Sequence, residues 1–213
     1  MTGENIDFMG RFADEANRAA KALSTSTNEY AKASLIFYQQ GLDEQEVAKR
    51  TAATIKMANV TGESASEISS YMTAIWNNFD KGTKSLEYYA DAMTALGAAT
   101  ASSTEEIATG MQQFASVAET VGLSYEYAAS ALATVVSATR QSEETVGTSF
   151  KTIFARLSSL SLGETLEDGT NLTKYSAALS SVGVNIKEGN GELKSMDKIL
   201  DELGHKWNNI SRE

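Results

Sequence analysis

The stretch that decides the fold is residues 103–124, STEEIATGMQQFASVAETVGLS. Five of its apolar residues are separated by four, three, four and three positions: Ile107, Met111, Phe114, Ala118 and Val121. This spacing puts them on one face of an α-helix, which has about 3.6 residues per turn. Ser103 and Glu106 form a capping box at its start. Gly122 is typical of a helix end, and Ser124 is typical of the residue that caps a new helix.

The same kind of apolar stripe recurs along the chain. The other stripes are Phe12, Ala16, Ala19 and Leu23; Ile68, Met72, Ile75 and Phe79; Leu86, Tyr89, Met93 and Leu96; Val146, Phe150, Ile153, Leu157 and Leu160; Leu172, Tyr175, Leu179 and Val182; and Ile199, Leu203, Trp207 and Ile210. Further capping pairs stand at Asp43 with Glu46 and at Ser64 with Glu67. Proline, which helix interiors exclude, is absent from all 213 residues. These patterns predict an all-α fold, a multi-helix bundle of about eight helices with short connections.

One segment departs from the helical pattern, at residues 184–194. Val184-Asn185-Ile186-Lys187 alternates between apolar and polar residues, and Glu188-Gly189-Asn190-Gly191 supplies turn residues. Glu192-Leu193-Lys194 then resumes the alternation, and Ser195 is placed to cap a last helix. Alternation on both sides of a glycine-rich turn predicts one small β-hairpin.

The breaks between stripes suggest three parts. Residues 1–41, which are polar at Ser24-Thr25-Ser26-Thr27, are expected to form an N-terminal helical arm. Residues 42–162 are expected to form the main helical bundle. Residues 163–213 are expected to form a helix–hairpin–helix subdomain packed on that bundle, after a long loop at 163–170.

Composition excludes several classes of site and partner. The chain has no cysteine and a single histidine, His205, so thiolate or multi-histidine metal sites are not expected. The net charge is −10, and no basic residue lies between Lys84 and Arg140. Nucleic-acid binding needs clustered lysine and arginine, so direct binding is not expected. Adsorption to anionic membranes is disfavoured for the same reason, and no apolar run approaches the ~20 residues that span a bilayer. No cofactor or metal is expected.

The candidate reactive groups are more simply explained as parts of helices. The acid pairs Glu105-Glu106 and Glu143-Glu144 stand at predicted helix starts, where the helix dipole favours negative charge. The Gly189-Asn190-Gly191 turn lacks the residues that complete a phosphate-binding loop. His205 is expected to be a solvated residue near a helix end. No residue is assigned a catalytic, cofactor-binding or metal-binding role.

The order of the motifs resembles a known family. The chain runs from Tyr89-Ala90-Asp91-Ala92-Met93 through Ser103-Thr104-Glu105-Glu106-Ile107 to Val121-Gly122-Leu123-Ser124. It continues with Gly147-Thr148-Ser149-Phe150-Lys151 and Phe154-Ala155-Arg156-Leu157, then Val182-Gly183-Val184 and Asp197-Lys198-Ile199-Leu200. From about Thr51 to Trp207 this succession resembles the core region of bacteriophage tail tape measure proteins.

The resemblance implies a structural protein of the virion rather than an enzyme. Such proteins lie in the lumen of the tail tube and in the host cytoplasm during assembly. They determine tail length and take part in tail assembly and genome delivery, in phages, prophages and tailocins. The implied partners are tail tube proteins, tail-tip or baseplate proteins and tail assembly chaperones, with self-association also possible. Because family members are usually much longer, the chain is expected to be a fragment of a larger polypeptide.

Two other functions stay open on the residues alone. One is a helical adaptor or effector unrelated to tails, with a partner surface built from aromatic residues. Those residues are Trp76, Tyr88, Tyr89, Tyr125, Tyr127 and Trp207. The other is a wall hydrolase, because helical lytic transglycosylases use a glutamate followed by serine as a general acid, and Glu63-Ser64 faintly resembles that motif. A capping role explains Ser64 equally well.

Overall fold

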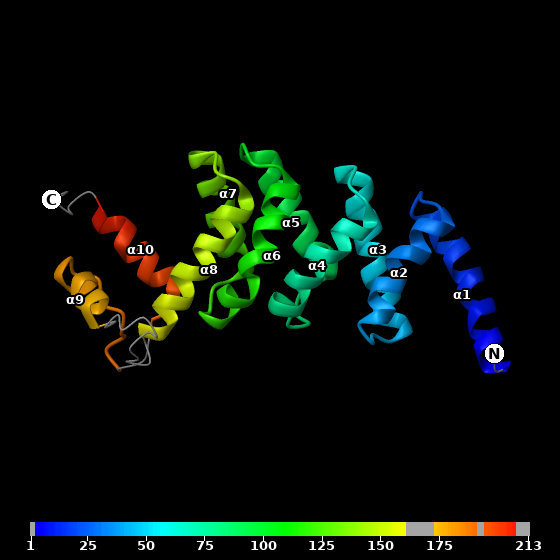
Figure 1. Ribbon diagram of the computed structural model, residues 1–213, viewed down its shortest axis with the longest axis horizontal. Coiled ribbons are helices and arrows are strands. Elements are labelled where there is room, and N and C mark those ends of the chain that lie inside the picture. Colours follow the sequence, from blue (N-terminus) through cyan, green and yellow to red (C-terminus); the bar gives the residue numbers. More distant parts are fainter. Residues whose placement is uncertain (1–2, 161–172, 191–193, 208–213) are drawn as a thin grey trace. The chain divides into compact units, whose positions relative to one another are not determined.

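The computed structural model describes residues 3–160, 173–190 and 194–207, and this part of the chain contains ten α-helices (Figure 1). They are α1 (Gly3–Ala22), α2 (Thr27–Gln39), α3 (Glu44–Thr61), α4 (Ala65–Phe79), α5 (Leu86–Ala99), α6 (Thr104–Thr120), α7 (Tyr125–Thr139), α8 (Glu143–Leu160), α9 (Thr173–Ser181) and α10 (Met196–Lys206). The predicted all-α class is confirmed for the described residues. The predicted loop at 163–170 lies outside them.

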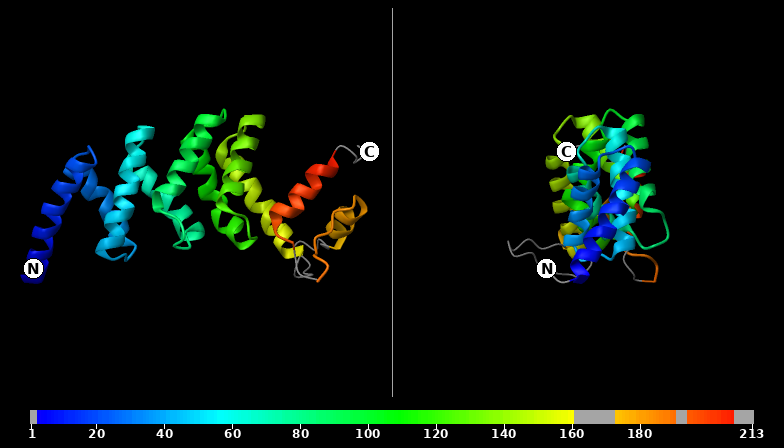
Figure 2. Two further views of the ribbon diagram at one scale, coloured as in Figure 1. Left: turned by 180° about the vertical axis from the view of Figure 1, so that it is seen from behind. Right: turned by 90° about the vertical axis from the view of Figure 1, so that its right-hand side faces the viewer.

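The chain divides into two compact units, residues 1–108 and 109–213. In the first unit successive helices run in opposite directions, as both Figure 1 and the reverse view in Figure 2 show. Besides the sequential neighbours, α2 packs against α4 and α3 packs against α5. These contacts between alternate helices arrange α2 to α5 in two layers, with α1 packed on α2. Short connections make this antiparallel packing possible.

The core of the first unit near its N-terminal end is built mainly from small side chains. It contains the buried residues Ala16, Ala20, Tyr30, Ala33, Ile55 and Ala65, with Phe12, Ala19, Leu23 and Ala58 packed against them. Alanine on α1 and α2 lets the two helices approach closely. The larger side chains lie towards α4 and α5, where Ile68, Met72, Ile75, Trp76, Tyr89 and Met93 are almost completely buried.

The second unit is organised by aromatic rings and by two glycines. The centre of the Phe114 ring on α6 lies 5.3 Å from the centre of the Phe150 ring and 6.0 Å from that of the Phe154 ring, both on α8. Nearby, a Cβ atom built on Gly147 would lie 2.5 Å from the carbonyl oxygen of Gly110. The backbones of α6 and α8 therefore touch at a point where no side chain fits. A smaller core joins Val184, Ile186 and Ile199.

Where the structure describes their side chains, the residues of the predicted apolar stripes are buried or half-buried, with two exceptions. Ile107, Met111, Phe114 and Ala118 are all at most 1% exposed. Two predicted core positions are wrong. Ile153 is 47% exposed, and Phe154 takes its place in the core at 2%. Trp207 is 60% exposed, because α10 ends at Lys206 and the tryptophan only caps it.

The structure has more helices than the eight or so predicted, and the main difference lies in the first forty residues. The polar segment at 24–27, which belongs to the expected N-terminal helical arm, separates α1 from α2. Ser24 has a positive φ of 55°, and the Ser26 side chain accepts a hydrogen bond from the Glu29 backbone N–H. Ser26 and Glu29 thus have the same spacing as the caps that the sequence analysis did recognise. The helix α2 packs into the first unit through its buried residues Tyr30, Ala33 and Phe37.

The predicted hairpin at 184–194 is not a two-stranded element in the described residues. Only Lys187 has bridge geometry, and the Lys194 N–H donates to the Ile186 carbonyl oxygen over 2.9 Å. Val184 and Ile186 are buried against Ile199 of α10. In the described residues their alternation therefore goes with burial under α10. Residues 191–193 of the predicted hairpin lie outside the described residues.

The contact between Gly110 and Gly147 makes a prediction. Gly147→Ala should lower the free energy of unfolding of the second unit by about 1–3 kcal/mol, because its Cβ would overlap backbone rather than a movable side chain. Urea unfolding followed by circular dichroism measures the change. Gly204→Ala is the matched control in the same unit, because nothing lies within 4 Å of its Cβ position and alanine favours helix. Equal stability of the two variants would show that the close backbone contact does not form.

Candidate functional site

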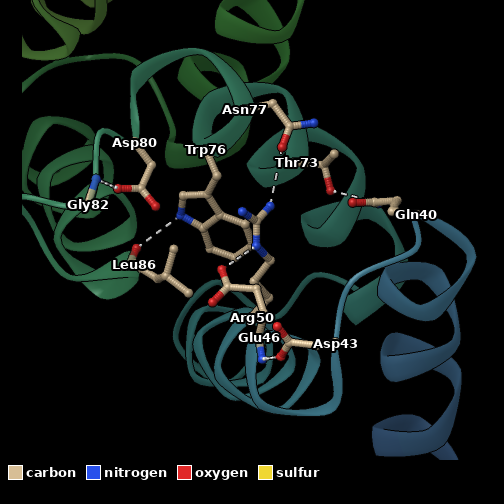
Figure 3. A network of polar contacts seen from close by, with 10 residues as sticks. All are labelled: Gln40, Asp43, Glu46, Arg50, Thr73, Trp76, Asn77, Asp80, Gly82 and Leu86. Carbon is tan, nitrogen blue, oxygen red and sulfur yellow. Dashed lines mark hydrogen bonds and ion pairs between the residues drawn. The ribbon is translucent and has the colours of Figure 1, made fainter.

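The best-defined polar arrangement in the first unit surrounds Arg50 of α3 (Figure 3). Its Nε donates to Glu46 Oε1 over 2.9 Å, one turn earlier on the same helix. Its Nη1 donates to Asn77 Oδ1 of α4 over 3.3 Å. The guanidinium also lies 5.3 Å from the centre of the Trp76 ring, within the range of a cation–π contact. Because Arg50 is only 8% exposed, its charge is compensated inside the protein rather than by water.

Trp76 carries the same network onward to α5. Its indole N–H donates to the Leu86 carbonyl oxygen over 3.2 Å, and its ring lies 6.0 Å from that of Phe37 on α2. The ends of the helices are fixed by similar contacts: Asp43 accepts from the Glu46 N–H at the start of α3, and Asp80 accepts from the Gly82 N–H after α4. The network thus ties α2, α3, α4 and α5 into one rigid frame, which is a structural role.

A second arrangement surrounds Glu63, in the connection between α3 and α4. Gly62 ends α3 in the left-handed conformation, with φ 80°. The next residue, Glu63, accepts a hydrogen bond from the phenol of Tyr71, which is 5% exposed. Burial raises the pKa of Glu63, the Tyr71 hydrogen bond partly offsets that rise, and the negative charge of Glu105 adds to it. Burial and the neighbouring Glu63 also raise the pKa of Tyr71.

These groups border a surface cavity of about 370 Å³ between α3, α5 and the start of α6. Its lining residues are Val60, Thr61, Glu63, Thr94, Gly97, Ala98, Ser103, Thr104 and Glu105. The cavity therefore offers two carboxylates and several hydroxyl groups. Among the residues that the structure describes, no three histidine or acidic side chains come together as a metal site.

Ser64 does not join Glu63 in a catalytic arrangement. Its hydroxyl accepts the Glu67 N–H over 3.2 Å and lies 2.7 Å from Glu67 Oε2, while the Ser64 N–H donates to the same carboxylate. This is a complete capping box for α4. The side chain of Ser64 is therefore committed to starting a helix, as the capping interpretation predicts.

The other candidate groups lie apart from this cavity or serve as helix ends. Glu105 and Glu106 lie in the first turn of α6, and Glu143 and Glu144 in the first turn of α8. The Glu106 carboxylate accepts from the Ser103 N–H over 2.7 Å. His205 is exposed near the end of α10, with Nδ1 2.8 Å from the Asp201 carbonyl oxygen. Gly189 and Asn190 form a turn, and Gly191 lies outside the described residues.

The aromatic residues considered as a partner surface do not form one. Trp76, Tyr89 and Tyr125 are at most 3% exposed and belong to the core. Tyr88 and Tyr127 are half-buried, and Trp207 alone of the six is highly exposed. Little in the local sequence identifies Arg50 or Tyr71, because their roles depend on partners on other helices or in a connection. The only local signal for Arg50 was Glu46 four residues before it.

Comparison with known proteins gives one family. The family described as phage-related minor tail protein matches residues 13–213. No solved structure matches the chain. None of the helices in the described ranges is both long enough and apolar enough to cross a membrane.

The environment of Glu63 makes a prediction about pH. Because burial raises its pKa above the ordinary 4.5, the folded chain favours the protonated carboxyl. The stability due to this preference is fully present below pH 4.5 and is lost as pH rises through the raised pKa. Glu63→Gln should therefore be more stable than the parent chain at pH 7 and equally stable at pH 4. Urea midpoints at the two pH values measure this.

Glu67 supplies a control of opposite sign. Hydrogen bonds from Ser64 lower the pKa of Glu67, so its stabilising contribution is present above pH 4.5 and is lost as pH falls. Glu67→Gln should therefore be less stable than the parent chain at pH 7. If Glu63→Gln also lost stability at pH 7, desolvation would not dominate at Glu63.

The Arg50 network makes a separate prediction. Arg50→Lys keeps the charge but cannot hold Glu46 and Asn77 together while covering the Trp76 ring. The free energy of unfolding should fall by about 1–2 kcal/mol, a range set by one lost hydrogen bond and a weaker cation–π contact. Thermal unfolding of this variant can be compared with Lys32→Arg, at an exposed ion pair with Glu29 that should change little. Equal melting temperatures for Arg50→Lys and the parent chain would contradict the structural role.

Proposed function

The chain belongs to the phage-related minor tail protein family, and on this premise we propose that it is a structural domain of a tail tape measure protein. The family match covers residues 13–213, which includes the whole segment from Thr51 to Trp207 where the motif order resembles tape measure proteins. The observation that carries the proposal is this agreement between a family-wide match and the order of the helix caps and stripes.

Within such a protein the proposed role is packing or docking rather than measurement. The longest described helix, α1, has 20 residues and a length of about 30 Å. A single helix of 213 residues would reach roughly 320 Å. Helices that fold back on one another, as in the first unit, contribute far less length per residue. The domain would instead contact other tail components during assembly, or act during passage into the host.

The proposed location is the lumen of the tail tube, with the host cytoplasm as the site of assembly. The proposed partners are tail tube proteins, tail-tip or baseplate proteins and tail assembly chaperones. Contact with DNA is not part of the proposal, because the net charge is −10 and the region between Lys84 and Arg140 lacks basic residues. No catalytic step is proposed.

Membership of a tail protein family favours this function over an adaptor unrelated to tails. A wall hydrolase has one supporting feature, the raised pKa of Glu63, which a general acid requires. Against it, the neighbouring Ser64 is occupied by the capping box of α4. The structural role therefore has the better support.

The proposal is tested in the virus or prophage that encodes the chain. Mass spectrometry of purified tails should detect its peptides. In-frame deletion of residues 1–108 should either block tail formation or give tails shorter by less than the ~160 Å that the same residues would span as one helix. Electron microscopy measures the lengths, with a synonymously recoded gene as control.

Two results would contradict the proposal. One is the absence of the chain from purified tails. The other is a deletion mutant whose tails match the control in number and length. Shortening by the full ~160 Å would keep the tape measure role but would show that this unit is extended in the tail.

A further inference from the structure

A continuous groove runs along the first unit between α3 and α5. It consists of three surface cavities of about 470, 400 and 370 Å³. The first and second cavities share Ser85 and Glu87, and the second and third share Val60 and Thr94. We call this feature the α3–α5 groove. It extends from Glu46 near the start of α3 to Glu63 just after its end, a distance of about 25 Å at the rise of an α-helix.

The lining of the α3–α5 groove suits a helix. Several of its non-charged lining residues are small: Ala52, Gly97 and Ala98 are at least partly exposed, and Ala53 and Ala90 are buried beneath the groove. Small side chains allow another helix to approach closely and pack its ridges into the groove. An extended peptide would gain little binding free energy from backbone hydrogen bonds, because the backbone groups of α3 and α5 are already paired within their own helices. This groove also has no sheet edge that such a peptide could join.

One exposed apolar side chain lies where the second and third cavities of the groove meet. Val60 lines two of the three cavities and is 69% exposed, although it lies in the last turn of α3. In a partner complex this side chain would be removed from water. It is therefore the point at which a substitution should block docking without disturbing the fold.

The two halves of the groove differ in charge. The half nearest the end of α3 is lined by the carboxylates Glu63, Asp91 and Glu105, and no basic residue lines the third cavity. In the middle, Lys56 is paired with Glu87 over 2.9 Å, so that pair adds no net charge. The other half is mixed, because Lys49 and Lys84 line it together with Glu46 and Asp80. The unbalanced negative charge thus lies at one end of the groove.

The walls of the groove are held in place before any partner binds. Arg50 and Asn77 join α3 to α4, and Trp76 joins α4 to the start of α5 (Figure 3). A preformed groove avoids the free-energy cost of ordering its own helices on binding.

We propose that the α3–α5 groove docks a helix of another protein, which places lysine or arginine side chains at Glu63, Asp91 and Glu105 and small apolar side chains along the alanine lining. Charge complementarity at the acidic end identifies the basic side chains of the partner. It also sets the direction, because the positive N-terminal end of the partner helix dipole favours the acidic end. The inference rests on the groove alone and does not depend on the proposed role in tails.

The test uses the whole chain and two synthetic helical peptides of about 20 residues, long enough to span the groove. Both peptides have an alanine–leucine face, and the first half of each carries either lysine or glutamate at otherwise identical positions. Fluorescence anisotropy of the labelled peptides measures Kd. The lysine peptide should bind and the glutamate peptide should not. Binding of the lysine peptide should weaken as salt is added, because the charges are exposed.

Three variants locate the binding site. The triple variant Glu63→Gln, Asp91→Asn and Glu105→Gln should bind the lysine peptide about tenfold more weakly, as expected for the loss of two exposed ion pairs and one partly buried pair. Val60→Arg should abolish binding, because it places a long charged side chain in the groove. The fold should be kept, because position 60 is exposed and the positive charge of arginine is favourable in the last turn of a helix. The matched control removes three exposed carboxylates outside the groove, with Asp14→Asn, Glu144→Gln and Asp201→Asn, and should bind like the parent chain. Circular dichroism checks that all three variants fold.

Several outcomes would overturn the proposal. Failure of the lysine peptide to bind would do so, as would equal losses in the groove variant and the control variant, since binding would then reflect net charge alone. A second copy of this chain is the other possible occupant of the groove, and analytical ultracentrifugation tests for it by measuring whether the chain dimerises. A dimer of the chain that Val60→Arg dissociates would show that a second copy, and not a different protein, fills the groove.

Discussion

None of the described helices can hide its apolar stripe by itself. They have between 9 and 20 residues, and in folded proteins most helical stability comes from packing of an apolar face rather than from helix propensity. Stability must therefore come from packing one stripe against another, and the short connections decide which stripes can meet. The first unit meets this constraint with alanine faces and the Arg50–Trp76 network. The second meets it by bringing the backbones of α6 and α8 into contact at Gly110 and Gly147.

The same constraint explains how much of the fold the sequence could predict. A stripe such as Ile107, Met111 and Phe114 is a local pattern, so its burial follows from helical geometry alone. On α8 the helical spacing allows either Ile153 or Phe154 to face the core. Phe154 is the buried one, and its ring packs against that of Phe114 on α6. At 184–186 the alternation predicts a strand, and the residue that buries Val184 and Ile186 is the distant Ile199 on α10. Periodicity favours the burial of one face, but it does not fix which side chains of that face are buried or which distant residues bury them.

The polar features were harder to predict for a related reason. Helix caps such as Ser64 with Glu67 are contained within four residues, so they could be read directly. Arg50 depends on Asn77 and Trp76, and the raised pKa of Glu63 depends on burial together with Tyr71 and Glu105. These partners are up to 42 residues away along the chain, a separation that no local pattern encodes. The α3–α5 groove belongs to the same class, because neither helix alone forms it.

A folded unit would have a particular consequence in a tape measure protein, the role proposed above for this chain. An α-helix advances about 1.5 Å per residue only while it continues in one direction, and each reversal from α1 to α5 cancels most of the advance before it. Residues in helices that fold back on one another add to the surface of the protein and little to its length. The surface here is acidic, contains few exposed large apolar side chains and includes a preformed groove lined by small residues. Such a surface favours specific, reversible contacts with basic helices over nonspecific association, which suits the role proposed above, in which the domain folds in the cytoplasm, packs in the tail tube and later leaves it.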